Sequence, residues 1–286
     1  MMTLVRRTTA LGAVAAASLA LAACGSTEAG QAPRPAPSAS SAGPSKTAVP
    51  TLAPGPAGLT PVFEHGPREG AGKTVALTFD ADMTADEGPR AAAGERFDNP
   101  QLIATLRRLK VPATVFMTGR WAEEYPDEAR SLGLDAQFEV ANHSYSHYAY
   151  TDDCYGLPTV PRERMRSDLE RAYTAFKRAG VPHPMPYFRF PGGCYDKTAL
   201  GELTPAGVTA VQWDVVSGDA FATDADAVAR QVLDGVRPGS VVVMHCTRSA
   251  APVTERAVRT VVPELRERGY RFVKVSELIG AADGRA

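Results

Sequence analysis

Thr74-Val75-Ala76-Leu77-Thr78-Phe79-Asp80-Ala81-Asp82 is the stretch that decides the fold of this chain. Its first six residues form a short apolar run that contains β-branched side chains, which predicts a buried strand. Similar short runs predict further strands at 113–117, 187–190, 208–216, 240–245 and 270–275.

Helical patterns separate these runs and cover residues 99–109, 121–132, 161–180, 224–236 and 254–268. In the first of them, Asn99 is suited to cap the helix and Pro100 to occupy its first turn. The alternation of strands with helices predicts parallel strands that are joined by crossover helices. The elements suffice for a barrel, so we expect an α/β barrel rather than an open sheet.

Polar side chains stand where the predicted strands end. Asp80 directly follows the first strand, Arg189 lies near the end of its strand, Asp219 comes just after another strand, and His245 ends the strand at 240–245. In parallel barrels the chemistry takes place at the carboxyl ends of the strands, so these four residues are candidates for one site. Taken alone, His245 is more typical of a core histidine and Asp219 of a turn.

His143 and His147 are the strongest indication of chemistry in a chain with five histidines. Their spacing of four residues predicts that both lie on one face of a single helical turn, where they can share an ion. Imidazole and carboxylate together are what a divalent metal such as zinc selects. With Asp80 and Asp82 upstream, the pattern indicates a metal-dependent hydrolase, although both histidines would also fit an ordinary loop.

Five short segments carry these residues in a fixed order: 78–82, 143–147, 189–193, 213–219 and 243–245. Their order and content resemble the polysaccharide deacetylases of carbohydrate esterase family four, also called the nodulation-type deacetylase homology domain. The resemblance implies a distorted (β/α) barrel with about seven parallel strands. It also implies removal of N-acetyl or O-acetyl groups from polysaccharides with a divalent metal, usually zinc.

The resemblance also implies a role for each candidate residue. His143 and His147 would be metal ligands, Asp80 the general base that takes a proton from water, and Arg189 the residue that orients this base.

On the other side of the site, Gly192 would offer a backbone N–H to the oxyanion. Asp219 would support His245, which would act as the general acid that protonates the departing amine.

The sequence departs from the family pattern at three of these segments, in the fifth only mildly, with Val243 where leucine is usual. The usual first segment has a second, metal-binding aspartate where this chain has Ala81. We expect Asp82 to supply the third metal ligand from a shifted turn; the alternative is that water completes the coordination and Asp82 is a loop acid. In the fourth segment Ala220 replaces a customary tryptophan and Val216 an acid, changes that would open or reshape the acetyl pocket.

The N-terminal segment predicts export. Residues 1–23 combine two arginines with a short apolar run and small residues, as in a secretory signal peptide, and the run is too short for a transmembrane anchor. The sequence before Cys24 resembles the bacterial lipobox, which implies lipid attachment at Cys24 and a place on the outer face of the cytoplasmic membrane. Residues 24–58, rich in Pro, Ala and Ser, predict a disordered linker, and residues 59–281 the folded domain.

Three cysteines remain after Cys24. An exported protein lies where disulfides persist, and an odd number allows at most one pair. All three are close to the segments above, so a disulfide that fixes an active-site loop is plausible, and we favour Cys154–Cys194 over a pair that includes Cys246. Three buried, inert thiols are the alternative.

These observations together predict a monomeric deacetylase tethered at the cell surface, acting on N-acetylated glycan such as peptidoglycan or a chitin-like polymer. An acetylxylan-type O-deacetylase would use the same chemistry. The altered first segment also fits a carbohydrate-binding protein that has lost turnover. A net charge of -1 without a basic stripe gives no support for nucleic-acid binding.

Overall fold

The computed structural model describes residues 48–284. The predicted signal peptide, Cys24 and most of the predicted linker lie outside the described residues.

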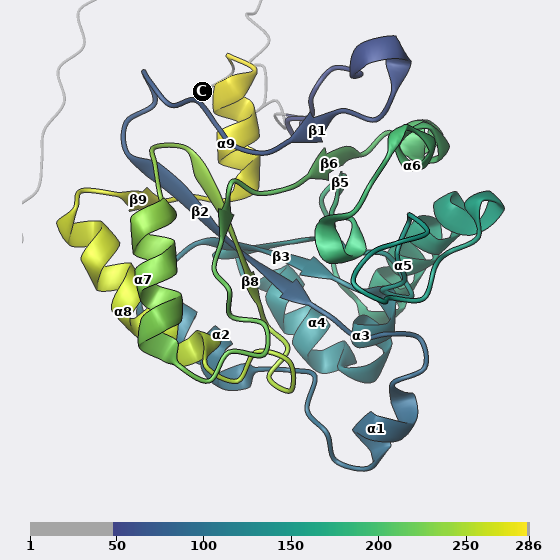
Figure 1. The fold of residues 1–286 in the computed structure, drawn as a ribbon, viewed down its shortest axis with the longest axis horizontal. Coiled ribbons are helices and arrows are strands. Elements are labelled where there is room, and N and C mark those ends of the chain that lie inside the picture. The colour runs from purple at the N-terminus through teal and green to yellow at the C-terminus, as the bar shows by residue number, and fades with distance from the viewer. Residues whose placement is uncertain (1–47, 285–286) are drawn as a thin grey trace, which may run out of the picture. The chain divides into compact units, whose positions relative to one another are not determined.

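A single parallel sheet forms the centre of the fold (Figure 1). Nine strands build it within residues 48–284: β1 (Val62–Phe63), β2 (Thr74–Ala81), β3 (Ala113–Met117), β4 (Phe138–Asn142), β5 (Tyr187–Phe188), β6 (Thr209–Val211), β7 (Val215–Val216), β8 (Ser240–His245) and β9 (Arg271–Phe272). The order is β1-β6-β5-β4-β3-β2-β8-β7, with β9 paired to β2, and every strand pairing is parallel.

The sheet is curled. β6 and β7 lie near opposite ends of the strand order, yet only residues 212–214 connect them. Since each residue spans at most about 3.5 Å, this connection brings the two ends of the sheet close together. The structure therefore confirms a distorted (β/α) barrel. The prediction of one strand at 208–216 is wrong, because the chain leaves one end of the sheet at Val211 and joins the other at Val215.

Helices cover the outside of the sheet (Figure 1). The helices within residues 48–284 are α1 (Gly88–Ala92), α2 (Pro100–Arg108), α3 (Gly119–Glu124), α4 (Pro126–Leu134), α5 (Met165–Ala179), α6 (Lys197–Leu203), α7 (Ala225–Gly235), α8 (Thr254–Glu267) and α9 (Val275–Ala282), with 3-10 turns at Pro56–Gly58, Arg162–Arg164, Pro191–Gly193 and Thr204–Ala206. None of these helices combines the length and apolarity that crossing a bilayer requires.

Local signals explain where the helices begin and end. The Asn99 side chain accepts a hydrogen bond from the Leu102 N–H and caps α2, as expected. The predicted helix at 121–132 is instead two helices, because Pro126 disfavours helical geometry at Tyr125 and starts α4. Gly180 ends α5 in the left-handed conformation that glycine adopts without strain.

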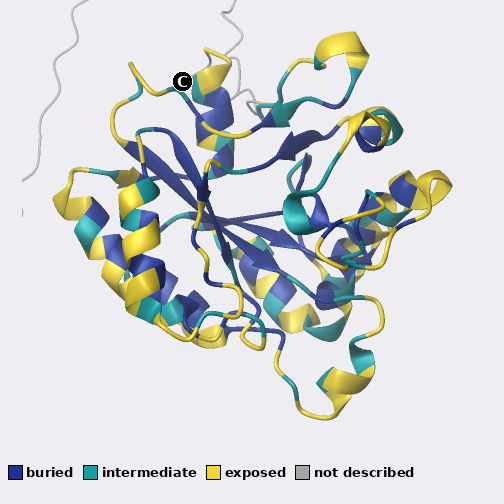
Figure 2. Ribbon diagram, viewed as in Figure 1, coloured by how far each residue is buried: buried dark blue, intermediate teal, exposed yellow. Residues whose placement is uncertain are grey.

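Strand alternation divides the core into two layers, and Figure 2 shows the strands buried between them. Ala76, Phe116, Ala141 and Val241 point into the barrel, where α9 packs beneath them. Their neighbours along the same strands, such as Leu77 and Val115, point outward and pack against the helices. A residue's parity in its strand therefore decides whether its side chain faces the barrel interior or the helix layer.

Contacts with the folded domain begin earlier in the chain than the predicted boundary at Leu59. The Tyr187 hydroxyl donates a hydrogen bond to the Pro50 carbonyl at 2.7 Å, and the Leu52 N–H donates one to the Thr209 hydroxyl at 3.2 Å. The Leu52 side chain packs against the interior core. For residues 48–58 the linker prediction is therefore wrong, because composition alone does not register these contacts.

Candidate metal centre and active site

β2 carries two acids to the mouth of the barrel. Because side chains alternate along a strand, Thr78 and Asp80 face the interior, whereas Phe79 and Ala81 are fully buried in the outer core. Asp82 follows the end of β2 and shares the parity of Asp80. The carboxylate at position 82 thus points into the site, whereas one at position 81 would meet an apolar layer.

The two histidines lie in a loop after β4, so the predicted helical turn is wrong. Ser144 and His147 both have positive φ, at 68° and 56°, which no helical turn allows. The Ser144 N–H donates to Asn142 Oδ1 at 2.8 Å, and the His147 N–H donates to Ser144 Oγ at 2.9 Å. These local hydrogen bonds hold a tight turn that aims both rings in one direction.

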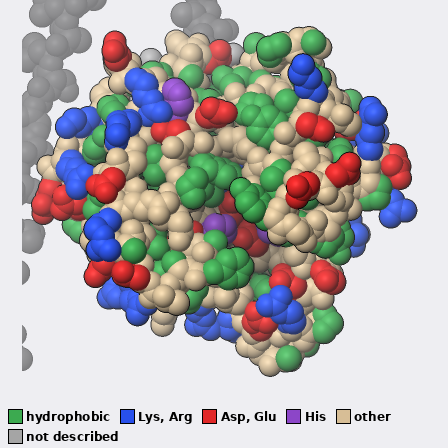
Figure 3. Space-filling model, in the orientation of Figure 1, with side chains coloured by type: hydrophobic (Ala, Val, Ile, Leu, Met, Phe, Trp, Pro, Cys, Tyr) green, Lys and Arg blue, Asp and Glu red, His purple; other side chains and the backbone are tan. Residues whose placement is uncertain are grey.

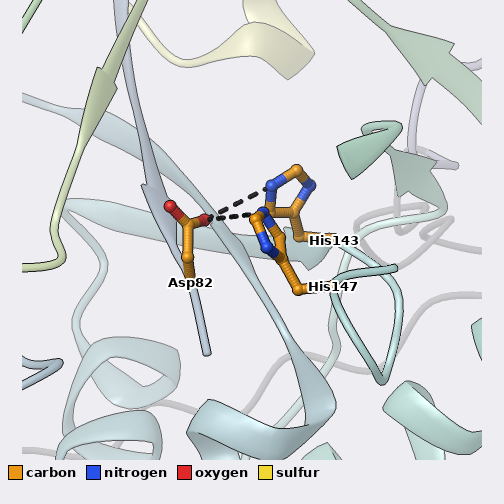
Figure 4. Close-up of side chains that lie close together, drawn as sticks. All are labelled: Asp82, His143 and His147. Carbon is orange, nitrogen blue, oxygen red and sulfur yellow. Dashed lines mark ion pairs between the residues drawn. The ribbon is translucent and has the colours of Figure 1, made fainter. Parts of the chain in front are cut away.

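Asp82, His143 and His147 converge on one point, as Figure 4 shows. Asp82 Oδ1 lies 3.3 Å from His143 Nε2 and 3.6 Å from His147 Nε2. This oxygen is buried and accepts no hydrogen bond from the described residues, so it lacks a partner that a cation would supply. His143 Nδ1 lies 2.9 Å from the Arg189 carbonyl, to which it donates, and this leaves Nε2 free to bind a metal. The three predicted ligands fit a divalent cation.

The electrostatics of this cluster suit a cation. Burial favours the neutral form of Asp82, but three neighbouring histidines outweigh burial and hold its pKa well below the usual value. Burial lowers the pKa of His147 to about 4. For His143, burial is outweighed by Asp80 and Asp82, which raise its pKa. An ionised carboxylate and a neutral His147 are the protonation states that metal binding requires.

Arg189 holds Asp80 from inside the barrel. Its guanidinium is fully buried and donates to Asp80 Oδ1 at 2.6 Å. Further hydrogen bonds to Thr78 Oγ1 and to the carbonyls of Val211 and Gln212 fix its position. The other carboxylate oxygen, Oδ2, remains directed at the metal cluster, 3.6 Å from His143 Nε2.

His245 faces the cluster from β8. Its Nδ1 lies 2.7 Å from Asp219 Oδ1, and its backbone N–H donates to Asp219 Oδ2. Burial would lower the pKa of His245, but Asp219 above all, with Asp82 and Asp80, outweighs burial and raises it to about 10. His245 Nε2 lies 3.9 Å from Asp82 Oδ2, so the proton that it carries points into the site.

A cavity of about 520 Å³ opens above these groups. Its lining includes Asp80, Asp82, His143, His147, Gly192 and His245. Figure 3 shows histidine and acidic side chains at the bottom of a hollow with hydrophobic side chains around it. Gly192, at φ 64°, lies beside the disulfide between Cys154 and Cys194. The presence of this disulfide confirms the favoured pairing, and Cys246 is a buried free thiol. The predicted site residues other than Cys24 therefore meet at one place.

Comparison with known proteins shows the family. The family profile described as polysaccharide deacetylase matches residues 68–211, about half of the chain. The chain belongs to the polysaccharide deacetylase family. It is accordingly a carbohydrate-deacetylating hydrolase of a metalloenzyme family, and Asp82, His143 and His147 form its candidate metal site.

Three known polysaccharide deacetylases and esterases illustrate the similarity. A chitooligosaccharide deacetylase from Bradyrhizobium sp. (strain ANU 289) is 27% identical over 218 residues, 71% of this chain and 92% of that protein. A peptidoglycan-N-acetylglucosamine deacetylase from Bacillus cereus is 27% identical over 209 residues, 72% of this chain and 88% of that protein. The structure of a family 4 carbohydrate esterase from Streptomyces lividans, in complex with acetate, is 28% identical with a TM-score of 0.56, covering 70% of this chain and 91% of that one.

Two residues that fix the geometry of this deacetylase were missed in the sequence. The Thr247 hydroxyl accepts a hydrogen bond from the Asp82 N–H at 2.8 Å and so pins the turn that presents the carboxylate. Its position two residues after His245 was the available signal. Asp168 Oδ2 accepts from the Tyr145 N–H at 3.2 Å and from the Tyr150 hydroxyl, and so holds the histidine loop against α5. An acid in the first turn of a helix gives no sign of that role.

Proposed function

We propose that the protein is a zinc-dependent deacetylase that hydrolyses the acetamide of N-acetylated sugars in peptidoglycan or a chitin-like glycan. The observation that carries the proposal is the orphaned Asp82 Oδ1, buried beside His143 Nε2 and His147 Nε2 and facing His245 across the cavity. Imidazole and carboxylate donors in a three-residue set are typical of catalytic zinc.

The proposed mechanism divides the proton transfers between two sides of the site. When bound, the metal supplies Lewis acidity and lowers the pKa of water. Asp80 Oδ2 takes a proton from the water whose oxygen attacks the acetyl carbonyl carbon, while Arg189 keeps Oδ1 occupied and the carboxylate in place. The Gly192 N–H donates to the developing oxyanion. As the carbon–nitrogen bond breaks, His245 Nε2 gives its proton to the leaving amine.

The choice of substrate rests on the relatives and on the predicted location. A chitooligosaccharide deacetylase and a peptidoglycan-N-acetylglucosamine deacetylase are both similar over more than two thirds of this chain. We further propose that residues 1–23 direct export, that a lipid on Cys24 tethers a monomer to the outer face of the cytoplasmic membrane, and that the linker lets the domain reach the wall. Residues 1–47 of these segments lie outside the described residues.

The test is acetate release by the purified protein from an N-acetylglucosamine pentamer, from peptidoglycan and from acetylated xylan. We expect release from the first two, loss with a chelator, and recovery when zinc is added. The Asp80→Asn variant should bind zinc as the wild type does, but release acetate about 10²–10⁴ times more slowly.

Two results would contradict this proposal. Glycan binding without acetate release under zinc, cobalt or manganese would identify a binding protein. Release from xylan alone would identify an O-deacetylase.

A further inference from the structure

Two aromatic side chains stand exposed at the rim of the catalytic cavity. Among residues 48–284, the large hydrophobic side chains with high exposure are Val49, Leu134, Tyr155, Val216 and Phe221. Tyr155 is 88% exposed and Phe221 84%, and both line the cavity that holds the candidate metal site. A single exposed hydrophobic side chain is ordinary, but two aromatic rings on the rim of one cavity offer apolar surface to a ligand that enters it.

The backbone at both positions is strained. Tyr155 has a φ of 52° and Phe221 a φ of 60°, a conformation that bulky side chains rarely adopt. Such strain persists only where the surrounding structure enforces it, and it is concentrated at functional sites.

A disulfide and a tight turn hold the backbone of Tyr155 beside Gly192, the residue predicted to bind the oxyanion. Cys154 is bonded to Cys194, and the Leu157 N–H closes a turn on the Cys154 carbonyl at 2.9 Å. A Cβ at Gly192 would lie 2.6 Å from Cys154 Sγ and 3.3 Å from the Tyr155 ring. Only glycine at position 192 therefore lets this loop lie so close to the site.

Two backbone hydrogen bonds hold the segment around Phe221 close to Asp219, the residue that supports His245. Its N–H donates to the Ala250 carbonyl at 2.6 Å, and the Ala222 N–H donates to the Asp219 carbonyl at 3.1 Å. Ala220, immediately before it, lines the same cavity.

We propose that Tyr155 and Phe221 are stacking platforms for sugar rings on either flank of the sugar that is deacetylated, so that the site acts on an extended glycan chain. The proposal rests on the function proposed above. The C–H faces of a pyranose ring pack on an aromatic face, and a rigid ring loses little conformational freedom when it does so. The occupant is a glycan because the rim is continuous with the cavity that receives the acetylated sugar.

The test compares an N-acetylglucosamine pentamer with the dimer. Tyr155→Ala and Phe221→Ala should each lower kcat/KM for the pentamer by roughly tenfold, mainly through KM, and change it less for the dimer. Tyr155→Phe and Phe221→Tyr, which keep a ring, should restore the preference for the pentamer. Leu134→Ala removes an exposed side chain on α4 outside this cavity and should change neither substrate.

Binding separates this inference from the proposed function. Titration calorimetry of the pentamer into the Asp80→Asn protein should show affinity weakened by roughly tenfold when Tyr155 or Phe221 is changed to alanine in that background. Equal affinities, or an unchanged pentamer-to-dimer ratio in the double variant, would overturn the inference. If the wild type bound the pentamer but released no acetate, the proposed function would be overturned instead. The calorimetry would still decide whether the rings of Tyr155 and Phe221 bind the glycan.

Discussion

At the scale of single residues, Asp82 shows how a strand's pleat selects a ligand. Position 81 points into the apolar layer beneath the helices, where a carboxylate would have no polar partner. Position 82 points into the site, and the Thr247 hydroxyl holds its backbone there. Asp82, one residue later than the family pattern expected from the sequence, is therefore a candidate third ligand within reach of both histidines.

Removing this ligand should abolish tight metal binding. We expect Asp82→Ala to weaken zinc affinity by more than about 100-fold, since loss of even an outer-shell partner costs about 10–100-fold. Titration calorimetry on the metal-free protein measures this. Asp86→Ala, which removes an exposed acid four residues later, is the matched control and should bind zinc as the wild type does. Equal affinity of the Asp82 and Asp86 variants would assign Asp82 to the loop acids.

The Asp219–His245 pair should set the alkaline limit of activity. His245 must carry a proton to act as the acid, so activity falls as pH rises through its pKa. Asp219 raises this pKa, and Asp219→Asn removes the charge that does so. The alkaline limb of the kcat/KM profile should therefore move to lower pH, by about 1–3 units, the usual effect of an adjacent opposite charge. An unchanged limb would mean that another group supplies the proton.

The chemistry-bearing residues were predictable from the sequence because their order and types are recognisable without coordinates. The conformation of the histidine loop was not. It depends on positive φ at Ser144 and His147, which nothing in their side chains announces, and on an acid from a helix that follows later in the chain. Spacing alone suggested a helical turn for the same two histidines.

At the scale of elements, sequence rules predicted the ends of helices whose own residues carry the capping signal. They did not predict strand boundaries that depend on contacts with distant parts of the chain. The Asn99 cap of α2 and the glycine at the end of α5 were both readable. The division of residues 208–216 into β6 and β7 could not be predicted. Both strands are short and apolar, and they are separate strands only because the curled sheet brings its two ends together at residues 212–214.

The disulfide should stabilise the domain through the loops that it joins. Cys154 and Cys194 are 40 residues apart, and closing a loop of that length stabilises a protein by about 4 kcal/mol. A Cys154→Ser, Cys194→Ser double variant should unfold roughly 8–16 °C below the wild type. Reductant should lower the unfolding temperature of the wild type toward that of the variant and leave the variant unchanged. A variant with the wild-type unfolding temperature would show that the loops are held without the bond.

At the scale of the whole molecule, closure of the barrel brings the two ends of the sheet together, and the segment before β1 packs onto the result. Leu52 contacts the interior core, and the Pro50 carbonyl accepts from Tyr187 on β5. Composition placed this segment in the linker because it contains few apolar residues. The Leu52 side chain and two hydrogen bonds between backbone groups of this segment and side chains of β5 and β6 nevertheless attach it to the surface that the rest of the chain provides.

A chain that begins at Leu59 should therefore be less stable than one that begins at Ala48. Two hydrogen bonds and a partly buried leucine together contribute about 2–3 kcal/mol, which corresponds to roughly 5–10 °C in unfolding temperature for a domain of this size. Tyr187→Phe provides the control, since its hydroxyl bonds to Pro50: the substitution should destabilise the longer chain and have little effect on the shorter one. If the chain from Leu59 unfolded at the same temperature as the longer chain, the contacts of Pro50 and Leu52 would contribute nothing to the stability of the folded state. The domain boundary predicted from composition, at Leu59, would then be correct.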